Sequence, residues 1–507
     1  MTSLWNSASE SVDGSPFEPG ARCDVVVVGA GITGLSTALM LARAGRRVIV
    51  VEAGEVAQLA TGSNTGKLSL LQGKVLSTLR AHHPASLVRA YVDANRAGAD
   101  WLSGFAEESG IPYTRHTAYS YAQTPAGRPT VEAEYDAARE AGLGVTRVAA
   151  LDVPFPLEAA VALDAQIAID PVAVAVGLAR AFITAGGVLH TGSRVTRVHT
   201  RPNTRVDTAR GPIFADQVVL ATGAPIADRG LYFVKTRGLR SYCVSFRTGS
   251  ALPDGLFLSV DSSTRSIRPV SIGDGPEAAL IVGGNGHPVG RAASERALVD
   301  DLVAWTTRFF PDAQESFRWS AQDYESDDLI PFVGAMPRGL GRIRFATGYG
   351  KWGLSNGPAA ALRITSEIVG TPWPDRPAWV RTIGTRMTVP ADLGRGIVEG
   401  AKVARAAVVG WANAETTPAP VPRPAEGEGV VAQRAGRPVG VSTVGGVTRG
   451  VSVVCTHLGG VLSWNDAECT WDCPLHASRF AADGARIEGP AVRDLAPLRA
   501  SGAPTTE

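Results

Sequence analysis

The amino-acid sequence predicts an α/β domain with a parallel sheet, an α+β domain inserted into it, and a small all-β module at the C-terminal end. Residues 24–28, "DVVVV", form an apolar β-branched run before a glycine-rich turn, and a helix-like stretch and a second apolar run, "RVIVVEA", follow. Residues 230–335 alternate between apolar and polar side chains, which favours a mostly antiparallel sheet. Beyond a Pro-rich stretch, short β runs separated by glycine-containing turns indicate the all-β module.

The composition suits a folded chain with a sizeable core. Hydrophobic residues make up 45% of the 507 residues and charged residues only 19%, which argues against disorder. Lys and Arg number 49 and Asp and Glu 48, so no global field would attract nucleic acid or an anionic membrane. No uninterrupted apolar run is long enough for a membrane span and no signal peptide is visible, so we expect a cytoplasmic protein.

The first domain is expected in three pieces of the chain. Strand-like and helix-like apolar runs return at "VAVAVGLARAFITAGG", "QVVLATGAP" and "IRFATGYGKWGLSNGPAAALRITSEIVG". "ETTPAPVPRPAEGEG" is poor in apolar residues and rich in proline, which is typical of a linker. The expected segments are a discontinuous first domain (21–90, 160–230 and 336–372), an inserted domain (91–159 and 231–335), a helical connection (373–414), a linker (415–428) and the terminal module (429–507).

The glycine-rich turn has the G-x-G-x-x-G pattern, formed by Gly29, Gly31 and Gly34. The first glycine permits a tight turn, the second lets the backbone approach a pyrophosphate, and the third lets helix and strand pack closely. Glu52 ends the second apolar run, eighteen residues after Gly34, where an acid would bind ribose hydroxyls. The pattern predicts a dinucleotide site, with a plain tight turn as the alternative, and it does not by itself separate FAD from NAD.

The chain resembles the glycine/D-amino-acid oxidase (DAO) superfamily of flavoproteins over residues 21–370. The resemblance rests on "DVVVVGAGITGLSTALMLARAGRRVIVVEAG", "VVLATGAP" and "ATGYGKWGLSNGPAAALRITSEIVG". It implies a bound FAD, non-covalent because no cysteine lies between residues 244 and 454. It also implies further FAD contacts at Val195, Gly223, Gly348, Gly350, Trp352, Gly353, Leu354, Ser355 and Asn356, although Val195 is equally well explained as a core valine.

Four other side chains are candidates for a role beside the flavin. The chain has only five lysines, and Lys67 and Lys351 both fall in segments near the predicted cofactor site. Either could stabilise a reduced, anionic flavin, or could instead form a salt bridge or contact the pyrophosphate. Arg240 and Tyr242 could hold a substrate carboxylate, although a surface arginine and a core tyrosine explain them as well. The catalytic acid or base is not identified.

The terminal module contains a C-x-H pair, Cys455 and His457, and a C-x-x-H pair, Cys473 and His476, with fifteen residues between the pairs. Zinc fingers usually place both cysteines on one arm, whereas here each arm carries one cysteine and one histidine. This order fits a Rieske [2Fe–2S] centre, with both cysteines on one iron and both histidines on the other. "CTHLGG", "CPLHAS" and "EGPA" also resemble the Rieske family, and a zinc site is the alternative.

Three features near these pairs refine the expectation. High-potential Rieske proteins carry an additional disulfide-linked cysteine in each box, and the equivalent positions here are Gly460 and Leu475. The resemblance therefore implies a centre of lower potential. Ser478 could donate a hydrogen bond to a cluster sulfur, or could simply cap its loop, while Cys469 lies outside both boxes.

A flavin exchanges two electrons and a [2Fe–2S] cluster one, so together they convert between two-electron and one-electron chemistry. The chain resembles a bacterial family that joins a DAO-type flavoprotein to a C-terminal Rieske domain, through "GYGKWGLSNG", "WSAQDYESDDLIPFVG" and "WDCPLHASRF". The resemblance implies an FAD-dependent oxidoreductase that oxidises an amine-like or amino-acid-like small molecule and exchanges electrons with a one-electron carrier. The alternatives are a reductase component with the opposite electron flow, and a flavoprotein with a structural zinc module.

Overall fold

The computed structural model describes residues 1–7, 11–227, 229–271, 278–384, 403, 405–406, 409–412 and 419–498. Unit 1 comprises Met1–Tyr232, Arg240–Gly286 and Val299–Met387, and unit 2 comprises Phe233–Leu239, His287–Leu298 and Thr388–Glu507. Much of the helical connection predicted over 373–414 lies outside the described residues, namely 385–402, 404, 407–408 and 413–414, as does the start of the linker predicted over 415–428.

The first sheet of unit 1 is built on the N-terminal strand–helix–strand stretch. β1 (Arg22–Val28) pairs in parallel with β2 (Val48–Val51) and β10 (Gly211–Leu220), and residues 25–28 are all buried, as expected for a parallel strand covered on both faces. The strand order is β16-β17-β10-β1-β2-β7, and β9 pairs with both β10 and β8. The other strands are β7 (Val188–His190), β8 (Val195–His199), β9 (Arg205–Thr208), β16 (Phe332–Ala335) and β17 (Ile343–Thr347).

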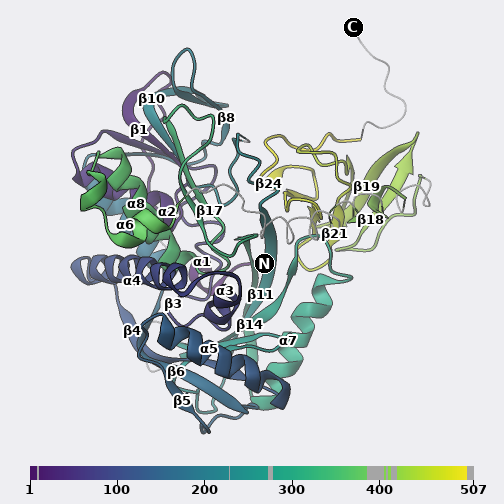
Figure 1. The fold of residues 1–507 in the computed structure, drawn as a ribbon. Coiled ribbons are helices and arrows are strands. Elements are labelled where there is room, and N and C mark those ends of the chain that lie inside the picture. The colour runs from purple at the N-terminus through teal and green to yellow at the C-terminus, as the bar shows by residue number, and fades with distance from the viewer. Residues whose placement is uncertain are drawn as a thin grey trace. The chain divides into compact units, whose positions relative to one another are not determined.

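Three helices pack together beside this sheet: α2 (Ile32–Arg43), α6 (Pro171–Thr184) and α8 (Gly353–Ile368). α2 contacts both α6 and α8, and Figure 1 shows the three grouped in unit 1. Asp170 caps α6 because its carboxylate accepts from the Val172 and Ala173 N–H groups. By contrast, neither Gly31 before α2 nor Trp352 before α8 caps its helix with a side chain.

The second sheet of unit 1 has nine strands in the order β15-β11-β14-β13-β12-β4-β6-β3, with β5 paired to β6. The pairs of β13 with β12 and β14 are antiparallel, whereas β12 and β4 run parallel. Its strands are β3 (Lys67–Leu68), β4 (Tyr113–Ala122), β5 (Thr146–Val148), β6 (Ala159–Ile169), β11 (Thr236–Arg247), β12 (Leu256–Ser259), β13 (Arg265–Ser271), β14 (Ala278–Pro288) and β15 (Gln314–Ser326).

The remaining helices are mostly amphipathic. In α4 (Ala85–Glu108), for example, Val88, Leu102 and Phe105 are buried while other positions are exposed, which is typical of a helix packed by one face. The other helical segments are α1 (Leu4–Ser7), α3 (Val75–His82), η1 (Pro125–Gly127), α5 (Arg128–Glu140), α7 (Glu295–Phe309), η2 (Trp373–Asp375) and α9 (Ala378–Thr382).

The C-terminal part of unit 2 consists of two small antiparallel sheets. Its core is formed by buried side chains that include Val453, Trp471 and Phe480. The first sheet contains β18 (Gly429–Arg434), β19 (Arg437–Val444) and β20 (Val447–Ser452), and the second contains β21 (Ser463–Asn465), β22 (Thr470–Asp472), β23 (Arg479–Ala481) and β24 (Arg486–Glu488). The predicted fold class, an α/β domain with an α+β insertion followed by an all-β module, is confirmed.

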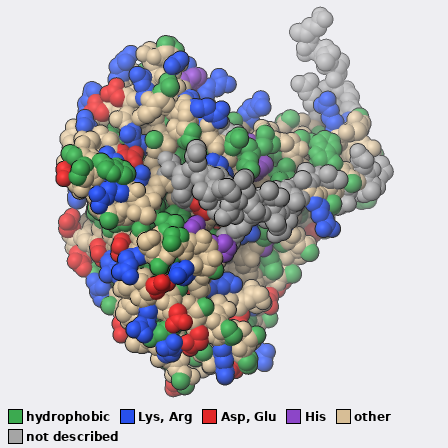
Figure 2. Space-filling view, in the orientation of Figure 1, with side chains coloured by type: hydrophobic (Ala, Val, Ile, Leu, Met, Phe, Trp, Pro, Cys, Tyr) green, Lys and Arg blue, Asp and Glu red, His purple; other side chains and the backbone are tan. Residues whose placement is uncertain are grey.

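The surface agrees with the balanced composition. On the face of unit 1 seen in Figure 2, basic and acidic side chains are interspersed. Within the described ranges, no helix combines the length and the apolar character needed to cross a membrane.

Candidate functional site

The turn between β1 and α2 requires its glycines for steric reasons. Gly29 has a φ of +108°, and a Cβ on it would lie 2.5 Å from the Ala221 carbonyl oxygen. A Cβ on Gly34 would lie 1.9 Å from the Gly29 carbonyl oxygen, so α2 approaches the turn more closely than any side chain allows. The turn therefore has the open backbone and close helix packing that the motif predicts for a pyrophosphate cradle.

Glu52 lies beside this turn. Its two carboxylate oxygens accept hydrogen bonds from the Ala30 N–H at 2.7 Å and the Gly54 N–H at 2.9 Å. Each oxygen keeps a further lone pair for a hydroxyl donor. Thr61 also belongs to this region, because its hydroxyl accepts from the Ile32 N–H at the start of α2 at 3.1 Å. No motif pointed to Thr61, since its contact is formed only by the return of the chain after β2.

The late glycine-rich segment reaches the same turn. The Tyr349 and Thr33 hydroxyls lie 3.0 Å apart, which joins residues more than 300 positions apart in the sequence. Gly348 and Gly350 have φ values of +83° and +56°, and α8 begins just after them at Gly353. The starts of α2 and α8 thus lie close to one another, and together they offer two helix N-termini to an anionic group.

Ser355 and Asn356 are predicted FAD contacts, but their side chains are bound within the protein. The Ser355 hydroxyl donates to the Asn95 amide oxygen at 2.5 Å, and the Asn95 amide donates to the Asn356 amide oxygen at 3.1 Å. Both residues and Leu354 are buried in α8. The polar network continues from Asn95 to Gln72 and Tyr91, which the sequence analysis did not identify because no motif marks them.

Gly223 and Val195 occupy different surroundings. Gly223 follows β10 with a φ of +71°, and its carbonyl oxygen accepts from the Thr347 hydroxyl at 2.5 Å, at the end of β17. Val195 is buried at the start of β8, within a cluster that includes Val26 and Ile49. The side chain of Val195 is therefore a core side chain, which leaves only its backbone for an adenine contact.

Lys67 is buried in β3 and is not an exposed cation. Its ammonium donates to the Phe257 carbonyl oxygen at 2.6 Å and to the Ser266 hydroxyl at 2.7 Å. Burial, together with the nearby Arg268 guanidinium, lowers the pKa of Lys67 to about 7. Lys67 thus ties β3 to β12 and β13.

Lys351 lies in the late glycine-rich segment with a left-handed φ of +75°. Its ammonium donates to the Ser241 hydroxyl at 2.6 Å, and its backbone N–H donates to the Asp323 carboxylate. Burial raises the pKa of Asp323 to about 6. Asp323 therefore anchors the turn that precedes α8, a role that the sequence did not suggest.

Arg240 and Tyr242 are both fully buried in β11. The Arg240 guanidinium donates to the Ser320 hydroxyl at 2.5 Å and to the Gln322 amide oxygen at 2.7 Å, both on β15. These bonds occupy the nitrogens of the fork that would grip a carboxylate. The structure thus places Arg240 as a link between two strands.

The two Cys/His boxes of unit 2 have equivalent backbones. In each loop the cysteine N–H donates to the carbonyl oxygen five residues later, at 2.8 Å for both Cys455 and Cys473. The residue four positions after each cysteine, Gly459 or Ala477, donates back to the cysteine carbonyl oxygen and has a left-handed φ. Because the loops match, each presents its cysteine and histidine in a similar way.

The four side chains form a cysteine pair and a histidine pair. The His457 and His476 ring centroids lie 5.2 Å apart. The two buried cysteine sulfurs lie within hydrogen-bonding reach, so the Cys473 thiol lowers the pKa of Cys455 while its own pKa is raised. Burial lowers the pKa of His476 to about 4, which leaves its ring neutral. Across the described residues, no three His, Cys, Asp or Glu side chains are placed to share a single metal ion.

Gly460 and Leu475 meet where the two loops face each other. A Cβ on Gly460 would lie 2.5 Å from the Leu475 Cδ1 and 3.4 Å from the Cys473 sulfur. The positions equivalent to the additional cysteines are therefore joined by a close apolar contact. Ser478 is fully buried nearby, where its hydroxyl accepts from the Ala491 N–H at 2.9 Å and bonds to the Cys455 sulfur.

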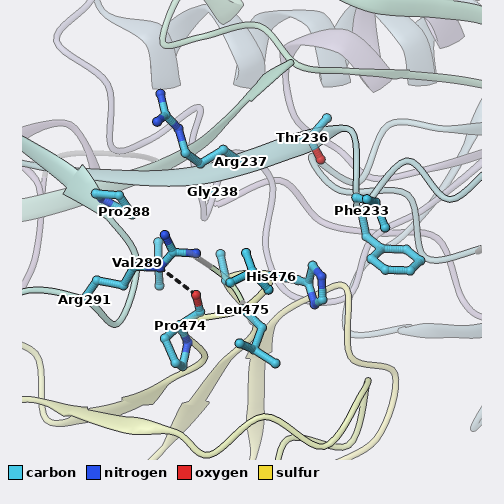
Figure 3. A pocket seen from close by; sticks show the side chains of 13 residues that line it. Phe233, Thr236, Arg237, Gly238, Pro288, Val289, Arg291, Pro474, Leu475 and His476 are labelled. Atoms are coloured by element: carbon cyan, nitrogen blue, oxygen red, sulfur yellow. Dashed lines mark hydrogen bonds between the residues drawn. The ribbon is translucent and has the colours of Figure 1, made fainter. Parts of the chain in front are cut away.

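A small hollow adjoins the histidine pair in unit 2. His476 and Leu475 line it together with Phe233 and Arg291, which come from outside the all-β module (Figure 3). The Arg291 guanidinium donates to the Pro474 carbonyl oxygen at 2.9 Å. The Phe233 ring lies edge-on to both imidazoles, with centroid distances of 4.9 Å to His457 and 4.8 Å to His476.

A buried ion cluster lies behind the second box. Arg479 pairs with Glu468 at 2.9 Å, Glu488 at 3.1 Å and Asp472 at 3.4 Å. Burial disfavours its charge, but the three carboxylates outweigh burial and raise the pKa of Arg479. The cluster thus ties β22, β23 and β24 together through one buried guanidinium.

Comparisons with known proteins identify the families of the two parts of the chain. A family model described as FAD dependent oxidoreductase (DAO) matches residues 24–367, and the Rieske [2Fe-2S] domain matches residues 420–499. YhfW of Bacillus subtilis (strain 168), named as a Rieske 2Fe-2S iron-sulfur protein, is 27% identical over 498 residues, which cover 97% of this chain and 96% of that protein. The cytochrome b6-f complex iron-sulfur subunit of Synechococcus sp. (strain JA-3-3Ab) is 38% identical over 97 residues, which cover 14% of this chain and 56% of that subunit.

Solved structures show the same fold in the flavoprotein part. Glycine oxidase from Geobacillus kaustophilus aligns with a TM-score of 0.60 and 22% identity, over 73% of this chain and 100% of that chain. L-Amino acid deaminase from Proteus myxofaciens aligns with a TM-score of 0.58 and 16% identity, over 72% of this chain and 94% of that chain. The chain therefore belongs to the DAO family of FAD-dependent oxidoreductases and carries a C-terminal Rieske domain, so that its cofactors are FAD and a [2Fe–2S] cluster.

Proposed function

We propose that this oxidoreductase dehydrogenates an amine-like or amino-acid-like small molecule and passes the electrons singly through the Rieske cluster to a one-electron carrier. The observation that carries the proposal is the presence, in one chain, of a steric cradle for a dinucleotide and of two matched Cys/His loops. When bound, FAD accepts two electrons from a substrate, whereas a [2Fe–2S] cluster carries one electron.

The dinucleotide would be held mainly by backbone. Gly31 would let the backbone approach the pyrophosphate, on a turn that Gly29 and Gly34 make possible, and Glu52 would accept the ribose hydroxyls through its remaining lone pairs. The segment Gly348, Gly350, Trp352 and Gly353 would approach the flavin side, because Tyr349 within it contacts Thr33 of the first turn. Asp323 would support this approach through its bond to the Lys351 N–H.

The cluster would be held by Cys455 and Cys473 on one iron and by His457 and His476 on the other. The paired arrangement supports this assignment over zinc, because a tetrahedral zinc ion needs its four ligands around one point. A binuclear centre instead needs two pairs on two metal ions, which is how the sulfurs and the imidazoles are grouped.

The amine-like substrate class is supported by the relatives of the flavoprotein part. Solved structures with this fold are named as glycine oxidase and L-amino acid deaminase, and both names refer to an amino acid. The Arg240 guanidinium is bound to Ser320 and Gln322, so substrate anchoring through this side chain has little support. The proposal therefore requires an amine group in the substrate and does not require a carboxylate.

Spectroscopy of the purified protein tests the cofactor assignment. We expect flavin bands together with a reduced-state EPR signal of low average g value, and two iron atoms per chain. Stoichiometric zinc without iron would contradict the ligand assignment and would indicate the structural zinc module.

Anaerobic reduction tests the direction of electron flow. A panel of amines and amino acids should include a compound that bleaches the flavin, after which the EPR signal of the reduced cluster should appear. If no compound bleaches the flavin but a reduced ferredoxin does, the chain is a reductase component and the proposed direction is wrong.

A further inference from the structure

Two segments outside the all-β module complete the surroundings of the Cys/His boxes. They are residues 233–239 and 287–298, here called the outer segments, and both belong to unit 2. Neither falls within residues 420–499, which match the Rieske domain.

The second outer segment packs against the backbone of the second box. Gly290 has a φ of +67°, and a Cβ on it would lie 2.9 Å from both the Asp472 carbonyl oxygen and the Pro474 nitrogen. The Gly290 carbonyl oxygen accepts from the Ser463 hydroxyl at 2.9 Å, and Arg291 donates to the Pro474 carbonyl oxygen. Further along, the Ser294 hydroxyl donates to the Asp466 carboxylate at 2.6 Å. This segment is therefore packed and hydrogen-bonded against the second Cys/His box.

The first outer segment covers the histidine pair. The Phe233 ring stands at 90° to both the His457 and the His476 rings, at centroid distances below 5 Å, so that one side chain lies over both imidazoles. Phe233 itself is partly buried, while its neighbour Val234 is 54% exposed. The Phe233 ring therefore contacts both histidines, whereas Val234 is mostly exposed.

We propose that Phe233 shields the histidine-ligated side of the Rieske cluster from water and thereby lowers its potential. The proposal rests on the ligand set inferred above. A cluster bound by two thiolates and two neutral imidazoles gains a negative charge on reduction, and an apolar, poorly solvated side disfavours the added charge. Phe233 is thus a shielding residue of the cluster that an outer segment of unit 2 supplies from outside residues 420–499.

The test compares full-length Phe233→Ala, Phe233→Leu and Val234→Ala, each loaded with both cofactors. An EPR-monitored redox titration should show a higher potential in Phe233→Ala, by at least a threefold change in the ratio of reduced to oxidised cluster, or about 28 mV. Loss of the visible cluster bands to a chelator in air should be at least about threefold faster in the same variant. Phe233→Leu should lie between Phe233→Ala and the wild type because it keeps apolar volume, and Val234→Ala should match the wild type.

A Phe233→Ala variant with a wild-type potential and a wild-type rate of cluster loss would overturn the proposal. If Phe233→Ala does not retain a cluster, Phe233→Leu decides, and wild-type values in that variant would have the same consequence. Neither readout needs a substrate, so a failure here is distinct from a failure of the proposed reaction. An error in the ligand set would instead appear as a missing Rieske EPR signal in the wild type.

Discussion

The dinucleotide turn of unit 1 and the Cys/His loops of unit 2 are built on opposite principles. The turn works by leaving side chains out: Gly34 lies where a Cβ would come within 1.9 Å of a carbonyl oxygen. The loops work by presenting side chains, with Cys455 and Cys473 on two backbones of the same hydrogen-bond pattern. The first site should therefore be disrupted by added side-chain atoms, and the second by removal of a ligand side chain.

Removal of a ligand should have the largest effect. Cys473→Ser should reduce cluster occupancy at least about 100-fold, because a thiolate ligand is lost, while the flavin bands persist. Iron content and visible spectra measure this. Cys469→Ser is the matched control, since the Cys469 thiol lies outside both boxes and its contact with the Gly427 carbonyl oxygen is long, at 3.8 Å. Equal iron content in both variants would remove Cys473 as a ligand.

Addition of one methyl group should break the first site. Gly34→Ala must move α2 away from the Gly29 carbonyl oxygen, which should cost about 2 kcal/mol and weaken FAD binding roughly 30-fold. Titration of the apoprotein with FAD gives the affinity. Gly104→Ala in α4 adds the same methyl where nothing lies within 4 Å, and it should leave the affinity unchanged. Unaltered FAD affinity in Gly34→Ala would argue against close helix packing at the turn.

The stability of the protein should depend on pH through the buried Lys67. The pKa of Lys67 falls from 10.5 to about 7 on folding, so between these values the unfolded chain binds more protons than the folded one. The free energy of unfolding should therefore rise with pH from 7 towards 10, by up to about 1.4 kcal/mol per pH unit from this group. Lys67→Met should lose this rise, as measured by thermal unfolding at pH 7 and 9. Lys74 is exposed, so Lys74→Met should keep the rise in unfolding free energy. If Lys67→Met and the wild type have the same pH profile, the lowered pKa of Lys67 is wrong.

The smallest effect should come from a hydrogen bond to sulfur. Ser478→Ala removes the hydroxyl bonded to the Cys455 sulfur. Reduction of the cluster should become less favourable by about 1 kcal/mol, which lowers its potential. Redox titration measures the change. Ser442→Ala is the control, because the buried Ser442 hydroxyl has no hydrogen-bond partner among the residues described. A potential that Ser478→Ala leaves unchanged would restrict Ser478 to capping the Ala491 N–H.

Motifs made of residues close together in the sequence predicted the local secondary structure. G-x-G-x-x-G between two apolar runs predicted the β1–α2–β2 unit, and the paired boxes predicted two loops of an all-β module. The roles predicted for single side chains stay predictions, and the structure shows only where these side chains lie. Arg240 looked available for a substrate but is bound to β15, and Ser355 and Asn356 are bound to a network around Asn95. Their partners lie far away in the sequence, and no spacing rule brings them together.

By itself, the sequence determined the fold class through local periodicity, and its resemblance to the DAO and Rieske families implied FAD and the [2Fe–2S] cluster, because residue types at short, fixed separations mark both families. The tertiary structure alone decided what surrounds these motifs. It brought the Tyr349 hydroxyl to that of Thr33, the Asp323 carboxylate to the Lys351 N–H, and the Phe233 ring to the two histidines. Such contacts arise where strands of different sheets end and loops return, and they depend on chain packing that local residue patterns do not record.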